Sequence, residues 1–216
     1  MAYKIFLSPS NQTENVYFGV DTNEATQCGK IASCTKDALI RCGFEVMLMH
    51  MYSMPEKVEQ ADKWGADAYA PIHTNATSKH NATGTHLFCY NKTGEGYKIC
   101  VKVLEHLGPL TPGSPDTISV RDDLYEVRMP DAPTVYIEVD FHDVPEVANW
   151  IVNHTKEIGE EICKGFCDYF NVPYVSEDPV KLYRVQVGAF KNREYAYDFL
   201  KEVRKHYPNA FVTEVR

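Results

Sequence analysis

Strand-like and helix-like patterns alternate along the first third of the chain, and this alternation constrains the fold more than any other feature. Apolar strand patterns at residues 4–8, 44–49 and 66–72 are separated by helical patterns at 23–42 and 55–64. This order is typical of a parallel, doubly wound sheet with helices on both faces. We therefore expect an α/β fold with a doubly wound, mostly parallel sheet flanked by helices.

Strand and helix patterns continue up to about residue 170. A polar loop is expected at residues 75–84, and the Asp143-Val-Pro-Glu146 start predicts one long helix that ends near Phe170. Between these points the spacing of apolar residues predicts a strand at 85–90, a helix at 97–107, a short strand at 124–127 and a strand at 134–139.

Turn-forming residues near the end of the chain predict a domain boundary. We expect a first domain at 1–172, a linker at 173–180 and a small unit at 181–216. Within the small unit, a strand at 183–187, a helix at 193–206 and a strand at 210–215 make one β-α-β unit. Such a unit, of about 36 residues, buries too little apolar surface to be stable alone.

Composition and charge exclude several classes of protein. Hydrophobic residues make up 44% of the chain, which is enough for a core. Residues 1–179 hold 14 basic and 26 acidic side chains, a net charge of -12, whereas 180–216 hold 8 and 4, a net charge of +4. The acidic body argues against a nucleic-acid partner, and the basic tail favours an anionic one. The seven cysteines include no C-x-x-C pair, so we expect reduced core residues.

Membrane insertion is not expected, because no run of eighteen apolar residues occurs. The N-terminus enters a strand pattern at once, without a basic region and a long apolar segment. We expect a protein made in the cytoplasm without a signal peptide.

Three titratable residues stand out as candidates for chemistry. His73 follows the apolar run 69–72, Glu24 lies in the first turn of a helix, and Glu138 interrupts the apolar run TVYIEV. Taken singly, His73 reads as a core histidine and Glu24 as a partner of the helix dipole. Glu138 is harder to explain by packing, since burying an unpaired carboxylate costs several kcal/mol. The carboxyl ends of parallel strands meet at one edge, where a histidine, a glutamate and a second carboxylate are typical of a hydrolytic zinc site.

Four segments carry a resemblance to a known family. They are KIFLSPSNQ, TNEATQ, PIHTNA (similar to S-I-H-x-N-A) and VYIEVDF (similar to v-E-x-G-F), and the last two are fairly specific. Residues 3–170 resemble the zinc-dependent N-acetylmuramoyl-L-alanine amidases of the Amidase_3 type, which are bacterial autolysins and phage endolysins. The resemblance implies Zn²⁺ as cofactor and peptidoglycan as substrate. It also implies Glu24 and His73 as zinc ligands and Glu138 as the catalytic carboxylate.

The chain departs from this family at one ligand. The family has a histidine in a P-G-H-G loop after the first strand, and here the loop reads Pro9-Ser-Asn-Gln12, with Asn11 at the ligand position. An amide oxygen is a poor zinc ligand compared with imidazole. Asn11 or Gln12 could bind weakly, water could complete the site, or His142 could replace the missing ligand; His80 and His86 are weaker candidates.

The tail has a resemblance of its own. YRVQVGAF at 183–190 resembles the opening of a SPOR domain, a peptidoglycan-binding unit with two β-α-β halves, of which this chain has one. Two readings follow: tails of two chains pair into a homodimer, or the tail is an appendage of the amidase domain.

The resemblance implies a peptidoglycan hydrolase that cleaves the amide between N-acetylmuramic acid and L-alanine of the stem peptide. Without a signal peptide, a phage or prophage endolysin released by a holin or by lysis is favoured over a secreted autolysin. Two alternatives remain open: a non-catalytic peptidoglycan-binding protein, and a zinc peptidase acting on another stem-peptide amide.

Overall fold

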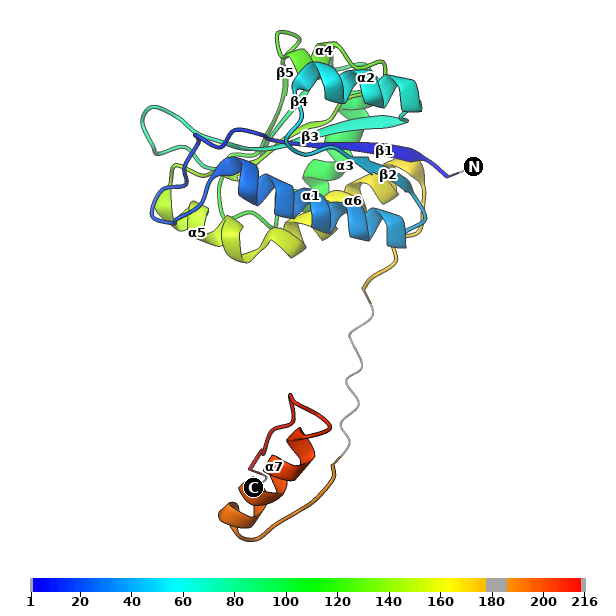
Figure 1. Cartoon of the computed structure of the whole chain (residues 1–216). Helices are drawn as coiled ribbons and strands as arrows, with labels where there is room; N and C mark the ends of the chain where they lie inside the picture. Colours follow the sequence, from blue (N-terminus) through cyan, green and yellow to red (C-terminus); the bar gives the residue numbers. More distant parts are fainter. Residues whose placement is uncertain (1, 178–185, 215–216) are drawn as a thin grey trace. The chain divides into compact units, whose positions relative to one another are not determined.

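The structure, a computed structural model, describes residues 2–177 and 186–214 (Figure 1). Contacts divide the chain into two compact units, Met1–Glu177 and Asp178–Arg216. Among the described residues, no helix is both long enough and apolar enough to cross a membrane. The strands of the first unit are β1 (Lys4–Pro9), β2 (Glu45–Leu48), β3 (Ala68–Asn75), β4 (His86–Cys89), β5 (Thr117–Val120) and β6 (Tyr136–Phe141). Its helices are α1 (Glu24–Arg41), α2 (Met54–Trp64), α3 (Glu95–Leu107), α4 (Tyr125–Arg128), α5 (Pro145–Asn153) and α6 (Thr155–Phe170).

The six strands form one sheet in the order β2-β1-β3-β6-β4-β5. All neighbouring pairs are parallel except β4 and β6, which are antiparallel. The predicted α/β fold with a mostly parallel sheet is confirmed. Because β4 and β5 run against the other four strands, they begin at the edge where β1, β3 and β6 end. The loops before β4 and β5 therefore share an edge with the loops after β1, β3 and β6.

Helices cover both faces of the sheet, so the first unit has three layers (Figure 1). On one face α1, α3 and α6 bury the larger core, which includes Ile31, Val103 and Phe166. On the other face α2 and α4 cover a smaller cluster around Phe6 and Tyr69. The helices α6 and α3 approach each other closely at Gly165. A Cβ added to Gly165 would lie 2.5 Å from the Cα of Val103 in α3. Burial of this apolar surface is the main favourable term in folding.

Local signals set the ends of the first two helices. The Asn23 side chain accepts a hydrogen bond from Thr26 N and caps α1. Ser53 and Glu56 form a capping box at the start of α2. Gly65 ends α2 in the left-handed conformation, at φ 69°, which glycine adopts without steric cost.

Three predicted elements differ from the structure. The segment predicted as a strand at 124–127 starts the short helix α4, and the strand that pairs with β4 is β5. The predicted long helix is interrupted at His154, which separates α5 from α6. The residue before α5 is Val144, and the Asp143 carboxylate instead accepts hydrogen bonds from the loop after β3. In each case tertiary contacts override local propensity.

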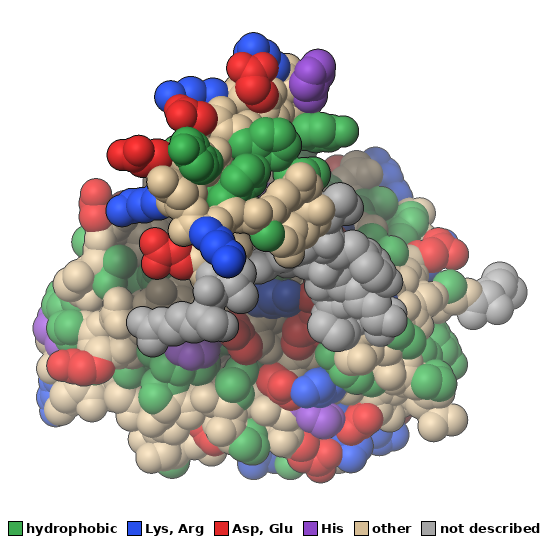
Figure 2. Space-filling view, turned by 90° about the horizontal axis from the view of Figure 1, so that it is seen from below, with side chains coloured by type: hydrophobic (Ala, Val, Ile, Leu, Met, Phe, Trp, Pro, Cys, Tyr) green, Lys and Arg blue, Asp and Glu red, His purple; other side chains and the backbone are tan. Residues whose placement is uncertain are grey.

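The second unit contains the helix α7 (Arg193–Arg204), which agrees with the predicted helix. Strands were predicted at 183–187 and 210–215. For the described residues 186–187 and 210–214 these predictions are wrong, because neither segment is in strand conformation. Residues 183–185 and 215 lie outside the described residues. Aromatic side chains of this unit are exposed, among them Tyr195, Tyr207 and Phe211. Figure 2 shows hydrophobic side chains at the molecular surface among charged ones.

Candidate active site

The site is built around His73, which lies inside β3. The predicted strand ended at residue 72, with His73 at its carboxyl end, whereas β3 continues to Asn75. Its pairing with β6 shifts register between His73 and Asn75, an irregularity of the kind that re-aims side chains beside active sites. His73 is 6% exposed, and its ring stacks on Tyr136 with ring centroids 4.7 Å apart. His73 is thus held in a fixed orientation at the carboxyl end of a buried strand.

Glu24 approaches His73 from α1. The Asn23 cap places Glu24 at the first position of the helix, where the dipole favours a carboxylate. Its Oε1 lies 2.8 Å from His73 Nδ1, and its Oε2 accepts a hydrogen bond of 2.6 Å from Asn15 Nδ2. Two residues that are 49 positions apart therefore form a buried pair that shares a proton.

Glu138 lies beside His73 on the neighbouring strand. The two residues are register partners between β3 and β6. Glu138 Oε2 is enclosed and, within residues 2–177 and 186–214, has no hydrogen-bond partner. The same holds for Nε2 of His73. The structure therefore brings together the three residues that the sequence singled out, and it leaves one polar atom on each of two of them unpaired.

Burial and charge set the protonation of this cluster. Burial raises the pKa of Glu138 to about 8; the charge of His73 opposes this shift and that of Glu24 adds to it. Burial alone would lower the pKa of His73, but the hydrogen bond to Glu24 and the charge of Glu138 outweigh it and raise the pKa. For Glu24, burial is outweighed by the hydrogen bond and charge of His73, and the pKa is lowered. His73 and Glu24 thus form an ion pair beside a carboxyl that holds its proton near neutral pH.

Asn11 is not part of this cluster. It is exposed, and its side-chain amide donates to Tyr52 O at 2.9 Å. Gln12 lies nearer to the pair, since its Oε1 accepts a hydrogen bond of 2.9 Å from the same Asn15 amide that binds Glu24. Sequence reasoning missed Asn15, which orients Glu24. The available signal was a run of amide side chains in the loop after β1.

His142 is buried next to the cluster and has partners of its own. Its Nδ1 lies 2.9 Å from Thr74 Oγ1 and 3.0 Å from Thr74 O, and its ring stacks on Tyr17 at 5.0 Å. Tyr17 also hydrogen-bonds Thr74 Oγ1 at 3.0 Å. Burial lowers the pKa of His142, against the charge of Glu24. The His142 ring is thus fixed by the side chain and the backbone of Thr74, and its role as a metal ligand stays a prediction.

The other two candidate histidines lie apart from His73. His80 is in the loop after β3, and its Nδ1 lies 3.0 Å from Asp143 Oδ2. His86 begins β4, pairs with Glu138 across the antiparallel ladder and packs its ring edge-on against Phe141. Neither ring contacts the Glu24 carboxylate through a hydrogen bond of the described structure.

Asp140 fixes two loops at the rim of the site. Its Oδ1 accepts from Gly84 N at 2.8 Å, and its Oδ2 accepts from Gly113 N at 3.2 Å. Gly84 has φ +106°, and a Cβ there would lie 2.5 Å from Pro115 O, so a side chain would not fit. The loops before β4 and β5 are thus tied to β6 close to Glu138.

A second polar group supports the strands under the site. Glu126 of α4 accepts hydrogen bonds from Ser8 Oγ and, at 2.6 Å, from Tyr69 OH. Lys57 of α2 is 1% exposed and donates to Pro9 O at 2.7 Å. Burial lowers the pKa of Lys57, while the charge of Glu126 opposes the shift. The sequence offered little sign of this group, because α4 was predicted as a strand.

Comparison with known proteins identifies the family. The sequence profile of the N-acetylmuramoyl-L-alanine amidases, Amidase_3, matches residues 13–168. The chain belongs to this family. A SPOR domain profile matches residues 165–214 of the chain. No curated protein matches the sequence.

Solved amidase structures share the fold of this Amidase_3 chain. The catalytic domain of CwlV, an N-acetylmuramoyl-L-alanine amidase from Bacillus (Paenibacillus) polymyxa var. colistinus, is 16% identical with a TM-score of 0.72, covering 80% of this chain and all (100%) of that one. An N-acetylmuramoyl-L-alanine amidase from Clostridium difficile 630 is 20% identical with a TM-score of 0.69, and the match covers 79% of this chain and 97% of that one. The catalytic domain of an endolysin targeting Clostridia difficile is 20% identical with a TM-score of 0.59, and the match covers 78% of this chain and 97% of that one.

The donors of the amidase site match a zinc ion in part. Glu24 Oε1 and His73 Nδ1 lie 2.8 Å apart, which is the distance of a shared proton, and one zinc ion bound to both atoms would separate them to about 3.3 Å. Catalytic zinc sites usually have three protein ligands. In the part of the chain that the structure describes, His, Cys, Asp and Glu donors come together in threes only at Cys42, Cys163 and Cys167.

Membership of the family supports peptidoglycan amidase activity. The site is consistent with that chemistry in two respects. It holds a carboxyl whose pKa lies near neutral, which is where a proton carrier is most effective. It also presents a buried Glu24–His73 pair joined by a 2.8 Å hydrogen bond.

Proposed function

We propose that this chain hydrolyses the amide between the lactyl group of N-acetylmuramic acid and L-alanine in peptidoglycan. Glu24 and His73 hold a zinc ion, and Glu138 carries the proton. The observation that supports this most directly is the pairing of Glu138 with His73 in the sheet, beside the Glu24–His73 contact of 2.8 Å. The amidase profile supports the choice of bond.

Each residue has a task that follows from its surroundings. A bound zinc ion supplies Lewis-acid polarisation of the scissile carbonyl and of the attacking water. Glu24 Oε1 and His73 Nδ1 would hold the ion once they give up the proton they share. Glu138, ionised beside a bound cation, would take the proton of the attacking water at Oε2 and pass it to the leaving amine.

The test of the proposal is product analysis with a matched variant. Wild-type protein with added zinc, incubated with a soluble muropeptide, is expected to release a peptide with a free N-terminal L-alanine. Glu138→Gln keeps the size of the side chain and removes its ability to accept the proton, so turnover is expected to fall by roughly 10²-fold or more. Zinc affinity measured by chelator competition is expected to fall much less than turnover, because Glu138 is not one of the proposed ligands. Unchanged turnover in the variant would contradict the role given to Glu138.

The position of Asn11 favours a second candidate, a non-catalytic peptidoglycan-binding protein. Asn11 stands where the family carries a histidine, and its amide is bonded to Tyr52 O. Asn11→His places at this position the residue type that serves as zinc ligand in the family. If the natural site is catalytic but weak, this variant is expected to bind zinc more tightly, by about tenfold or more, with activity at lower zinc concentration. Binding to intact walls with no product from either protein would favour the second candidate.

The same product analysis separates the third candidate, a peptidase acting on another stem-peptide amide. That enzyme would release a different N-terminal residue, or none from a dipeptide substrate. The zinc ligands and Glu138 serve either amide, so the bond that is cleaved decides between the two activities.

For the tail we propose peptidoglycan binding, with pairing of two copies. The support is the SPOR profile at 165–214, the net charge of +4 in residues 180–216, from 8 basic and 4 acidic side chains, and the exposed aromatic residues Tyr195, Tyr207 and Phe211. Aromatic rings that are exposed in one copy can be buried by a second copy.

A further inference from the structure

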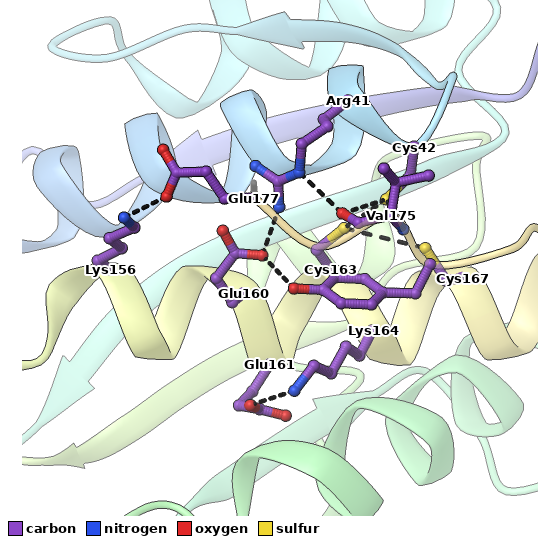
Figure 3. A network of polar contacts seen from close by, with 11 residues as sticks. Arg41, Cys42, Lys156, Glu160, Glu161, Cys163, Lys164, Cys167, Val175 and Glu177 are labelled. Carbon is purple, nitrogen blue, oxygen red and sulfur yellow. Dashed lines mark hydrogen bonds and ion pairs between the residues drawn. The ribbon is translucent and has the colours of Figure 1, made fainter. Parts of the chain in front are cut away.

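Three thiols converge in the first unit where α1 ends against α6 (Figure 3), whereas Glu24 lies at the other end of α1. Cys42 caps the end of α1, and Cys163 and Cys167 lie one turn apart on α6. The Sγ atoms of Cys163 and Cys42 are 3.7 Å apart, and those of Cys163 and Cys167 are 3.9 Å apart. All three sulfur atoms lie within 4.8 Å of one another, and all three residues are buried and reduced.

These spacings fit coordination of one metal ion. A metal bound to thiolates at about 2.3 Å separates the sulfur atoms by about 3.8 Å. A disulfide requires sulfur atoms at about 2.05 Å, so the described arrangement is the dithiol form at every pair. Residues four apart on a helix point to the same side, and α1 ends against that side of α6.

The number and type of donors select the metal. The described residues supply three thiolates and no fourth His, Asp or Glu donor within the set. Structural zinc sites are almost always four-coordinate. Soft thiolate ligands favour Cu⁺, which accepts three ligands. The buried position of Cys163 and Cys167 keeps water from supplying the missing fourth ligand.

Neighbouring groups lower the cost of burying thiolates. Val175 N donates to Cys42 Sγ at 3.3 Å, and Arg41 Nε donates to Val175 O at 2.8 Å. The Arg41 guanidinium also pairs with Glu160 at 2.6 Å, as Figure 3 shows. A backbone N–H donor and a nearby guanidinium both stabilise negative charge on sulfur.

We propose that Cys42, Cys163 and Cys167 form a three-thiolate site that binds one Cu⁺ ion in preference to Zn²⁺. The ion joins the end of α1 to α6 and, through the Val175–Cys42 hydrogen bond, fixes the segment that follows α6. The site is separate from the proposed amide hydrolysis and does not depend on it.

The experiment uses the full chain, reduced and kept free of oxygen. Cu⁺ is added in competition with the chelator bicinchoninate, and X-ray absorption reports the atoms around the metal. One Cu⁺ per chain is expected, with three sulfur neighbours at about 2.3 Å. Zn²⁺ added in equal amount is expected not to displace it. Hydrogen exchange at the Val175 amide is expected to slow when Cu⁺ binds.

Paired variants test which thiols bind. Cys163→Ala is expected to weaken Cu⁺ binding by more than the roughly 10–100-fold typical of losing a group that only supports a ligand. Cys34→Ala, which removes a half-buried thiol from α1 outside the set, is expected to leave binding unchanged. Circular dichroism of the metal-free variants checks that both fold.

Several results would overturn the proposal. Fewer than three sulfur neighbours in the wild-type protein, or equal loss of affinity in both variants, would contradict the three-thiolate site. Displacement of Cu⁺ by an equal amount of Zn²⁺ would contradict the preference for Cu⁺. Absence of Cu⁺ binding in competition with the chelator would leave the thiols as packing residues. The wild-type spectrum gives its answer even if Cys163→Ala fails to fold.

Discussion

Replacing Glu138 by glutamine should make the metal-free protein more stable at alkaline pH. Burial raises the pKa of Glu138 from the usual 4.5 to about 8. Below pH 4.5 the folded and unfolded states both hold this proton. Between the two pKa values only the folded state keeps it, so the free energy of unfolding falls by about 1.4 kcal/mol for each pH unit. The contribution is lost as the pH rises through the folded pKa.

The structure sets the size of the effect. The pKa difference corresponds to about 5 kcal/mol of lost stability at pH values above the folded pKa. Glutamine has the same shape and does not titrate. The stability of Glu138→Gln relative to wild type is therefore expected to rise by about 4 kcal/mol between pH 5 and pH 8. A cation beside the carboxylate favours its ionised form, so added zinc is expected to shrink this difference.

Urea unfolding at four pH values, with a chelator present, measures the effect. The matched control is Glu157→Gln, which makes the same chemical change at an exposed position of α6. The reasoning is refuted if the stability difference between Glu138→Gln and wild type stays constant within about 0.5 kcal/mol over this range. Such a constant difference would mean that the carboxyl is already charged in the folded protein over this range.

Three further predictions follow from the fold and the tail. His73→Ala is expected to lose zinc binding and activity together while circular dichroism keeps its helical signal, because catalytic metals contribute less to folding than structural ones; stoichiometric zinc in the variant would contradict this. Gly165→Ala places a Cβ 2.5 Å from the Cα of Val103 and is expected to lower the free energy of unfolding by about 1–3 kcal/mol, measured in urea. Deleting residues 178–216 is expected to weaken wall binding and convert a dimer to a monomer in light scattering, with muropeptide hydrolysis nearly unchanged; unchanged mass and binding would mean a passive tail.

Much of the fold could be predicted from the sequence, because apolar periodicity reports burial. The order of the first three strands and the placing of Glu24, His73 and Glu138 at one sheet edge followed from that pattern. The antiparallel direction of β4 could not be predicted, since periodicity is the same in either direction. The short helix α4 was missed because four residues are too few to show a helical period.

The parts of the site that depend on side-chain direction were less predictable. Asn11 occupies the expected position in sequence, but whether its amide turns to Tyr52 or to Glu24 depends on hydrogen bonds that the sequence does not reveal. The three thiols were read as core residues, which agrees with their burial. Their convergence depends on how α1 ends against α6, and Cys42 is 121 residues from Cys163.

Asp140 accepts one hydrogen bond from each of the two rim loops, and this arrangement allows the loop sequences to be replaced. Residues two apart on a strand share a face, so Glu138 and Asp140 move together with β6. The loop between Thr77 and Gly84 can then change in length or sequence without moving Glu138, as long as Gly84 N still reaches Asp140. A loop from another amidase could be grafted between these anchors to change what the rim contacts while the catalytic strand stays as it is.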